Sequence, residues 1–299
     1  MLMNTELKID ALLPPEMALK AEIVGVRKAE MACLPMFALA VLAGAFIALG
    51  AIFSTTLIAG AGSTGIIAAD GSLAYRSALP FGIQRLLAGL AFCLGLILVV
   101  VAGAELFTGN NLIVMAWANK KVSTLKLLRN WVIVYLGNFA GSLGAAGMIY
   151  LSGHYKYGGG AIGTAALSIA NAKASLEFVP ALFLGVLCNA LVCLAVWMTY
   201  SARSTTDKIL SIIFPITAFV AAGFEHSVAN MYFIPIGLFI KYFDPALTAR
   251  LAESAGLNLE KLTWGNFLNN LVPVTLGNII GGAGLVALVY WLVYLRQAK

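Results

Sequence analysis

Two short stretches place a carboxylate and an amide inside long apolar segments. The first is GAELFTGN, with Glu105 and Asn110, and the second is GFEHSVAN, with Glu225 and Asn230. Both follow the pattern G-x-E-x-x-x-x-N. A buried carboxylate needs hydrogen-bond or ion-pair partners, and asparagine tolerates turns and caps helices. We therefore expect these four side chains to support two breaks in apolar helices, by bonding backbone groups that the breaks leave free.

His226 lies inside the second of these stretches. It is one of 2 histidines in the chain, and the other, His154, falls in a loop where we expect it to be solvated. An imidazole can donate or accept a hydrogen bond, and its unperturbed pKa is about 6.5. A buried histidine is often only a satisfied core residue, but an ionisable residue inside a membrane usually has a function. We therefore interpret His226 as a functional residue.

The composition indicates an integral membrane protein. Of the 299 residues, 61% are hydrophobic and 11% are charged, whereas soluble domains carry about 25% charged residues. The apolar runs are continuous rather than alternating, which predicts helices and not a β-barrel. No cleavable signal peptide is visible in the charged N-terminal segment, residues 1–33, where residues 14–32 fit a surface helix. The 4 cysteines fall in or beside apolar runs and contain no CxxC pair, so we interpret them as small buried hydrophobes.

The uncharged runs predict six crossings, with the second and fifth interrupted by Glu105 and Glu225. If both termini lie in the cytoplasm, the inner segments carry 12 of the 19 Lys and Arg residues, and this bias favours that orientation. The predicted transmembrane domain covers residues 34–296. The expected outer segments include an extracytoplasmic insert at residues 244–264, which is expected to form a short amphipathic helix.

A second recurring pattern divides the chain into two halves. GNFAG at residues 137–141 is matched by GNIIG at residues 277–281, in the same order as the two break motifs. Three crossings in each half give the halves opposite orientations, which predicts an inverted repeat of about residues 34–155 and 177–296. Matched breaks near the middle of the membrane must face protein or water, and half-helix N-termini favour an anion.

The stretches AGAELFTGNNL, GFEHSVANMYFIP and NLVPVTLGNIIGG resemble the signatures of the formate–nitrite transporter family. The resemblance covers nearly the whole chain and is stronger to the formate branch. It implies an all-α, aquaporin-like fold of six transmembrane helices, assembled as a homopentamer with one pore in each protomer. It also implies a multi-pass protein of the bacterial inner membrane that transports formate. On this interpretation the protein is not an enzyme and has no cofactor, metal or nucleic-acid partner.

The resemblance also implies roles for individual residues. His226 is the central pore histidine and Thr108 is the hydroxyl that it faces. Asn189 lies near the outer mouth, and Lys173 draws anions into the outer vestibule, although a lysine at a span end can simply snorkel. The apolar constrictions comprise Phe92, Leu96, Leu106, Phe107 and Phe219, for which ordinary helix packing is the alternative.

These residues suggest how an anion could cross. Desolvating a bare anion between apolar rings is very costly, so we expect a small carboxylate to pass as the neutral acid or together with a proton on His226. Nitrite, hydrosulfide, acetate and lactate remain alternative substrates. A water channel would carry paired N-P-A motifs, which this sequence lacks. A membrane enzyme or a haem-bearing electron carrier would need histidine pairs or metal-ligand clusters within its spans.

Overall fold

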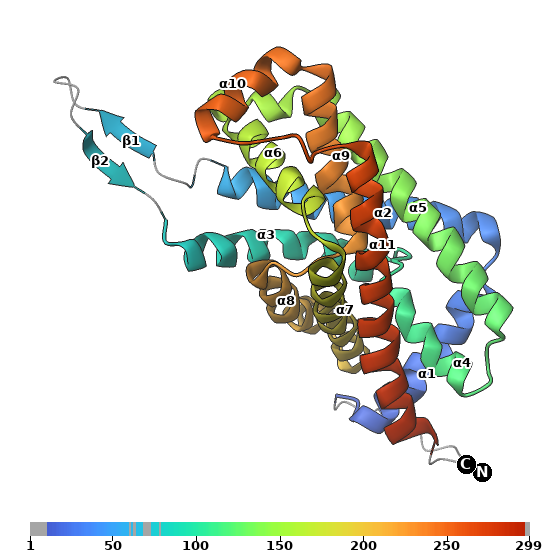
Figure 1. Cartoon of the computed structure of the whole chain (residues 1–299). Coiled ribbons are helices and arrows are strands. Elements are labelled where there is room, and N and C mark those ends of the chain that lie inside the picture. Colours follow the sequence, from blue (N-terminus) through green and yellow to red (C-terminus); the bar gives the residue numbers. More distant parts are fainter. Residues whose placement is uncertain (1–10, 60, 62–63, 68–72, 78, 297–299) are drawn as a thin grey trace, which may run out of the picture.

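The computed structural model describes residues 11–59, 61, 64–67, 73–77 and 79–296, which form a bundle of helices (Figure 1). In this part of the chain, 6 helical segments are long and apolar enough to cross a membrane, in agreement with the six predicted crossings. They are α2 (Cys33–Ile58), α3 (Phe81–Val101), α5 (Thr124–Leu151), α7 (Phe178–Ser201), α8 (Thr205–Ala222) and Trp264–Leu295. The last segment comprises α11 (Trp264–Ile279) and two π-helical stretches, η4 (Ile280–Leu288) and η5 (Trp291–Leu295).

The helical path is interrupted at both break motifs. After α3 the chain is irregular until η1 (Gly109–Ile113) and α4 (Val114–Ala118). After α8 it is irregular until α9 (Ser227–Phe243). Each interruption begins with a left-handed glycine, Gly103 at φ 82° and Gly223 at φ 79°. A residue with a β-carbon would be strained in this conformation, so the first residue of each motif has a backbone reason to be glycine.

Shorter helices lie outside the crossings. Where the surface helix was expected, the chain forms α1 (Pro14–Glu30), which begins at two prolines suited to a first turn. Residues 1–10 of the predicted N-terminal segment lie outside the described residues. The expected helix of the insert is α10 (Pro245–Ala255), capped by Asp244. α6 (Ala161–Ala174) was not predicted, and it follows two 3₁₀ turns, η2 (His154–Lys156) and η3 (Gly158–Gly160).

A β-hairpin joins α2 to α3 and is an addition to the predicted all-α fold. β1 (Thr64–Ile67) pairs antiparallel with β2 (Leu73–Ser77), with Thr64 opposite Ser77 and Gly65 opposite Arg76. Figure 1 shows the hairpin projecting away from the helical bundle. The all-helical prediction is therefore confirmed for the bundle, and this short hairpin is added to it.

Glycines allow the crossing helices to approach closely. A β-carbon on Gly141 of α5 would lie 1.9 Å from the Val41 carbonyl oxygen of α2, and one on Gly281 would lie 2.1 Å from that of Val186 in α7. Small residues at such contacts let helix backbones pack directly in a bilayer. The equivalent contact thus occurs once in each half of the chain.

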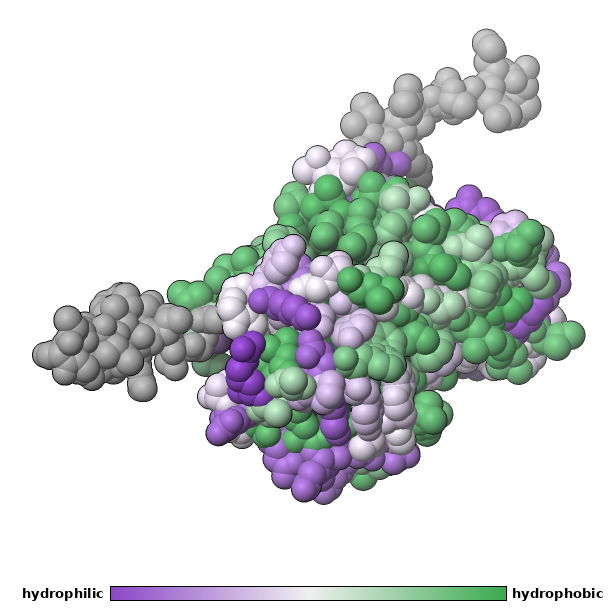
Figure 2. All heavy atoms as spheres, turned by 90° about the horizontal axis from the view of Figure 1, so that it is seen from above, coloured by the Kyte–Doolittle hydropathy of each residue, from purple (hydrophilic) through white to green (hydrophobic). Residues whose placement is uncertain are grey.

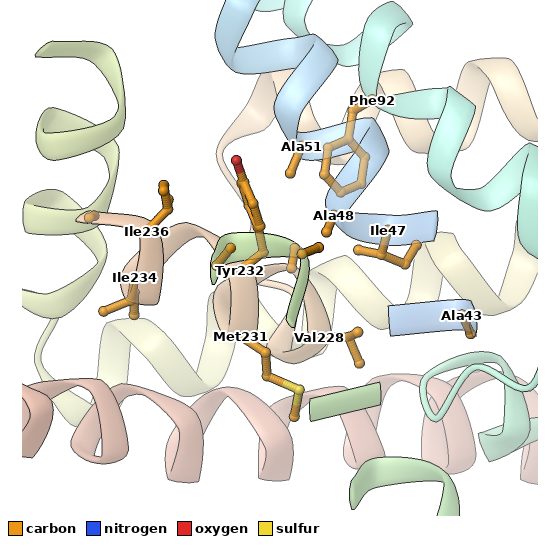
Figure 3. Packing of buried hydrophobic residues seen from close by; sticks show 14 of the residues in the cluster. Ala43, Ile47, Ala48, Ala51, Phe92, Val228, Met231, Tyr232, Ile234 and Ile236 are labelled. Atoms are coloured by element: carbon orange, nitrogen blue, oxygen red, sulfur yellow. The ribbon is translucent and has the colours of Figure 1, made fainter. Parts of the chain in front are cut away.

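α9 packs in the middle of the bundle rather than at its edge. In Figure 3, Val228, Met231 and Tyr232 of α9 lie among buried residues that include Ile47 of α2 and Phe92 of α3. The outside of the bundle is also apolar, because many large hydrophobic side chains of the crossing helices are exposed. Figure 2 shows this broad apolar surface, with hydrophilic residues gathered in separate patches. The protein is therefore a multi-pass membrane protein whose apolar exterior suits a bilayer.

Candidate functional site

The first helix break is held by a cluster around Glu105, which is 5% exposed. Lys28 of α1 forms an ion pair with Glu105, with 2.8 Å between Nζ and Oε1, and also donates to Asn110 Oδ1 at 3.0 Å. Asn110 Nδ2 donates to Glu105 Oε2 at 2.7 Å and to Asn130 Oδ1 at 3.0 Å. Both carboxylate oxygens are therefore paired, as a buried carboxylate requires.

The second break is held in the same way around Glu225, which is 4% exposed. Lys173 of α6 forms an ion pair with Glu225, again with 2.8 Å between Nζ and Oε1. Asn230 Nδ2 donates to Glu225 Oε2 at 2.6 Å and to Asn270 Oδ1 at 2.7 Å. The two clusters differ at one atom, because Asn230 Oδ1 has no partner among the described residues, whereas Lys28 binds the equivalent atom in the first cluster.

The equivalence of the two clusters extends to helices that precede the predicted repeats. Lys28 and Lys173 lie on α1 and α6, ahead of the predicted repeat starts at residues 34 and 177. Each half therefore contains a leading helix whose lysine reaches the break in its own half. The equivalent pairs are Lys28 and Lys173, Glu105 and Glu225, Asn110 and Asn230, and Asn130 and Asn270.

An asparagine from the third crossing of each half clamps the backbone of the break. Asn138 accepts from the Phe107 N–H at 2.9 Å and donates to the Glu105 carbonyl at 2.9 Å. Asn278 accepts from the Ser227 N–H at 2.9 Å and donates to the Glu225 carbonyl at 3.0 Å. These bonds satisfy backbone groups that a broken helix leaves unpaired at membrane depth.

The two breaks meet at a central pair formed by Thr108 and His226. Thr108 Oγ1 and His226 Nε2 are 3.0 Å apart, and both residues are buried. His226 is the N-cap of α9, and its Nδ1 accepts the Ala229 N–H at 3.1 Å. Since Nδ1 is an acceptor, a neutral imidazole carries its proton on Nε2 and donates it to the Thr108 oxygen. The Thr108 hydroxyl hydrogen is then free to be donated to another acceptor.

Asn189 lies at the level of this central pair and not near an outer mouth as expected. It is fully buried, and its Nδ2 donates to the Thr108 carbonyl at 3.3 Å and to the Asn278 carbonyl at 2.7 Å. The Cys193 thiol also points to the Thr108 carbonyl, with 3.3 Å between the sulfur and the oxygen. Asn189 therefore holds the backbone of Thr108 through its carbonyl oxygen, and it lines neither of the two cavities described below.

Two cavities lie near the central pair, one lined in part by α6 and the other by α1. Figure 1 shows these two helices toward different ends of the bundle. The α6-side cavity has a volume of about 310 Å³, and His226, Phe92 and Phe219 are among its lining residues. The α1-side cavity has a volume of about 390 Å³, and its lining includes Leu96 and Leu106. Of the central pair, His226 lines the α6-side cavity and Thr108 lines neither, whereas the α1-side cavity reaches Leu106 and Gly109, close to Thr108 in the chain.

The barrier between the cavities is thin and mostly apolar. Phe92 and Leu96 face different cavities yet are one helical turn apart on α3, which is about 6 Å along the axis. The Phe92 and Phe219 rings meet edge to face with centroids 5.6 Å apart, and Phe219 stacks on His226 with centroids 6.0 Å apart. Phe92, Phe219 and Leu106 therefore place apolar surface beside the polar pair.

Phe107, the fifth residue expected in the constrictions, lines neither cavity. Its ring packs edge to face on Tyr135 and Trp131 of α5, with centroid distances of 4.9 Å and 6.1 Å. Its place in the sequence beside Leu106 and Thr108 suggested the pore, but neighbouring residues of an irregular loop point in different directions. Packing against α5 is therefore the observed use of this side chain.

Lys173 does line the α6-side cavity, but its ammonium group already has partners. It forms the ion pair with Glu225 and lies 5.5 Å from the centroid of the Phe233 ring. The other cation of this cavity, Arg85, donates through Nε and Nη2 to backbone carbonyls at the end of α8, at 3.0 Å and 2.6 Å. The positive potential expected from Lys173 is therefore largely offset by Glu225, and the geometry assigns this lysine to holding the break.

Sequence reasoning missed five of the residues that build the site: Lys28, Asn130, Asn138, Asn270 and Asn278. The two asparagines of the clamp, Asn138 and Asn278, were visible as the repeated GN dipeptide, which could have been assigned this role. Nothing local signals Lys28, because its partner Glu105 is 77 residues away in the chain.

The described residues contain no group of three or more His, Cys, Asp or Glu side chains that could hold a metal ion. Cys93, Cys188 and Cys193 are buried, Cys33 is exposed, and all four are free thiols. The polar chemistry of the site therefore rests on hydroxyl, imidazole, amide and ion-paired groups.

Comparisons with known proteins agree with this architecture. A family model described as "Formate/nitrite transporter" matches residues 15–292. The chain is 43% identical over 296 residues to "Formate channel FocA" of Escherichia coli (strain K12), covering 99% of both chains. It is 39% identical over 285 residues to "Formate channel FocA" of Haemophilus influenzae (strain ATCC 51907 / DSM 11121 / KW20 / Rd), covering 94% of both.

Solved structures give the same result. A "pentameric formate channel with formate bound" is 43% identical, with a TM-score of 0.76 and coverage of 88% of this chain and 98% of that one. An "FNT family ion channel" is 29% identical, with a TM-score of 0.72 and coverage of 93% of this chain and 98% of that one. With a family model spanning most of its length and full-length relatives at this identity, the chain belongs to the formate/nitrite transporter family.

Proposed function

We propose that this protein is a channel for formate, the small monovalent anion of a weak acid. The observation that carries the proposal is the central pair, Thr108 and His226, buried between two cavities behind apolar side chains. Two relatives named as formate channels support the choice of substrate. The pore is expected to lie within each protomer of a homopentamer, because the similar solved formate channel is pentameric.

The protein is placed, as part of the same proposal, in the bacterial inner membrane with both termini in the cytoplasm. The excess of Lys and Arg in the segments on the side of the termini supports this orientation. The α1-side cavity is then cytoplasmic and the α6-side cavity opens outward.

At the centre, the substrate meets a hydrogen-bond donor and no free charge. The Ala229 N–H keeps His226 Nδ1 as an acceptor, so Nε2–H supports the Thr108 oxygen and the Thr108 hydroxyl donates to a carboxylate oxygen. A bare carboxylate would still lose its hydration between Phe92, Phe219 and Leu106, which is very costly. Passage as the neutral acid avoids that cost, so transport should be faster at acidic pH.

Loading a proton on His226 requires a local change. A proton on Nδ1 would face the Ala229 N–H at 3.1 Å, donor against donor, so the ring must first give up its N-cap bond. Proton coupling through His226 is therefore linked to movement at the start of α9. Glu105, Asn110, Glu225 and Asn230 support the two loops during this movement and do not contact the substrate.

The test is uptake of formate, and separately of nitrite, into proteoliposomes at two external pH values. His226→Asn is compared with the wild type, because asparagine can still cap α9, and His154→Asn in the 3₁₀ turn η2 serves as the matched control. We expect formate to be preferred and faster at the acidic pH, and His226→Asn to conduct with an altered pH profile. Nitrite uptake equal to formate uptake would refute the substrate, and an unchanged pH profile in His226→Asn would refute the role of the histidine.

A further inference from the structure

The α1-side cavity carries more positive charge than the α6-side cavity. Four cationic side chains line it, Lys20, Arg27, Lys28 and Lys208, against the single carboxylate of Glu105. The α6-side cavity has two cations and one carboxylate. The charge at the two ends of the pathway is therefore unequal, with the excess on the side of α1.

The cations of the two cavities also differ in whether they already have an ion-pair or hydrogen-bond partner. Both α6-side cations are engaged, one in an ion pair and the other on backbone carbonyls. On the α1 side, Lys28 is paired with Glu105 and Lys20 donates to the Tyr200 carbonyl at 2.7 Å. For the side chains of Arg27 and Lys208, the described part of the chain offers no ion pair or hydrogen bond. These two cations lie on separate elements, α1 and α8, that border the same cavity.

The surroundings of Lys20 agree with an excess of positive charge. Burial, and then the nearby charges of Lys208 and Arg203, lower the pKa of Lys20 from its ordinary value. The cations around this cavity outnumber its one carboxylate, so they repel each other, and a bound anion relieves that repulsion.

We infer that Arg27, Lys208 and Lys20 form an anion-collecting site at the α1-side mouth, which takes small carboxylates before they reach the central pair. The inference deepens the proposed formate channel and rests on it. A charged site in a concave, low-dielectric mouth raises the local concentration of a counter-ion. The channel should therefore saturate at a lower formate concentration when formate arrives from the α1 side than when it arrives from the α6 side.

The test is formate flux into inside-out and right-side-out membrane vesicles, which present the two mouths separately. The variant Arg27→Gln/Lys208→Gln removes these two charges without breaking a side-chain hydrogen bond to any described residue. Lys121→Gln removes an exposed charge from the turn after α4, which packs on α1, and is the matched control. We expect the double variant to raise the half-saturating formate concentration from the α1 side about threefold to tenfold at low salt, with the maximal rate kept. The α6-side value and the control should not change, and molar salt should abolish the difference.

Equal shifts from both sides, or an equal shift in Lys121→Gln, would overturn the inference. An anionic lipid headgroup shares the carboxylate's charge, so the flux is repeated in proteoliposomes of zwitterionic lipid with and without phosphatidylglycerol. An effect of the double variant that appears only with phosphatidylglycerol would assign the cluster to lipid and overturn the small-anion site.

Failure of the formate proposal can be separated from failure of this inference. If the wild type moves nitrite but no formate and keeps the same asymmetry, the substrate is wrong and the collecting site stands. A further readout needs no transport, since a bound anion stabilises the folded protein. Formate should raise the Tm of the purified wild type more than that of the double variant, and an equal rise in both would overturn the site.

Discussion

Lys173→Met tests whether Lys173 holds the second helix break through its ion pair with Glu225 or supplies positive potential for anions. In the structure Lys173 and Glu225 are 2.8 Å apart, and their side chains are 15% and 5% exposed. Removing one partner of a buried ion pair costs about 3–5 kcal/mol, because the other charge stays buried and unpaired. Since the lysine retains some contact with solvent, we expect the lower end, about 3 kcal/mol. In a chain of 299 residues that corresponds to a fall in Tm of about 5 °C.

A second substitution in the same cluster should reverse much of this loss. In Lys173→Met/Glu225→Gln no charge is left buried, and the glutamine oxygen can still accept from Asn230, which now donates to Glu225 Oε2 at 2.6 Å. The double variant should therefore be more stable than Lys173→Met alone, by about 2 kcal/mol of coupling between neighbouring sites. Thermal unfolding of the purified protein measures both values, with the exposed Lys261→Met as the control.

Transport by the same variants then tests the assignment of Lys173. If the lysine acts by holding the second break, the double variant recovers formate flux together with stability. If it acts as a source of positive potential for anions, the double variant regains stability and stays slow, because the lysine charge is still missing. That second result, or a Lys173→Met protein as stable as the wild type, would refute the reasoning.

Two further predictions concern packing and pH. Gly141→Ala should reduce the free energy of unfolding by about 1–3 kcal/mol and so lower the Tm, because its β-carbon would lie 1.9 Å from the Val41 carbonyl oxygen. Gly144→Ala is the control and should leave the Tm unchanged, because nothing lies within 4 Å of its β-carbon. The hydrogen bond from Tyr155, followed by weaker effects that include Lys156, lowers the pKa of Asp244 in the loop before α10. A lowered folded pKa stabilises the protein above the unfolded value of about 3.9, and this stabilisation is lost as the pH falls through the folded value. Tyr155→Phe should therefore lower the Tm at neutral pH and reduce its fall on acidification, and parallel Tm curves for the two proteins would contradict this.

The crossings and the break motifs were predictable because their signals are local. A run of about 20 apolar residues has one low-energy arrangement in a bilayer, so the six spans follow from composition. A carboxylate within such a run, as at Glu105 and Glu225, is too costly to be accidental. The facing of Thr108 and His226 came from the family resemblance, and the structure brings the two atoms to 3.0 Å.

The hairpin, α6 and the depth of Asn189 were not predictable, because they depend on short elements or on contacts between residues far apart in the chain. The hairpin strands, Thr64–Ile67 and Leu73–Ser77, are too short to show clear alternation, although the Asp70-Gly71 dipeptide between them is a known hairpin signal. α6 has 14 residues, too few to count as a crossing. The depth of Asn189 follows from its bond to the Thr108 carbonyl, 81 residues away in the chain, which no spacing rule predicts.

The two halves share a scaffold but not a chemistry. Residues 120 positions apart are equivalent in the breaks, as Glu105 and Glu225 show, so the equivalent of His226 is Leu106 and that of Thr108 is Val228. Leu106 and Val228 are buried, at 2% and 0% exposure, and as a pair they can offer no hydrogen bond. The Glu and Asn residues that occur in both halves hold the two breaks in shape. The polar pair of Thr108 and His226 occurs at only one of the two equivalent places. The residues that agree between the halves are those that hold the two breaks, and the residues that differ include the central pair, Thr108 and His226, which we propose to face the substrate.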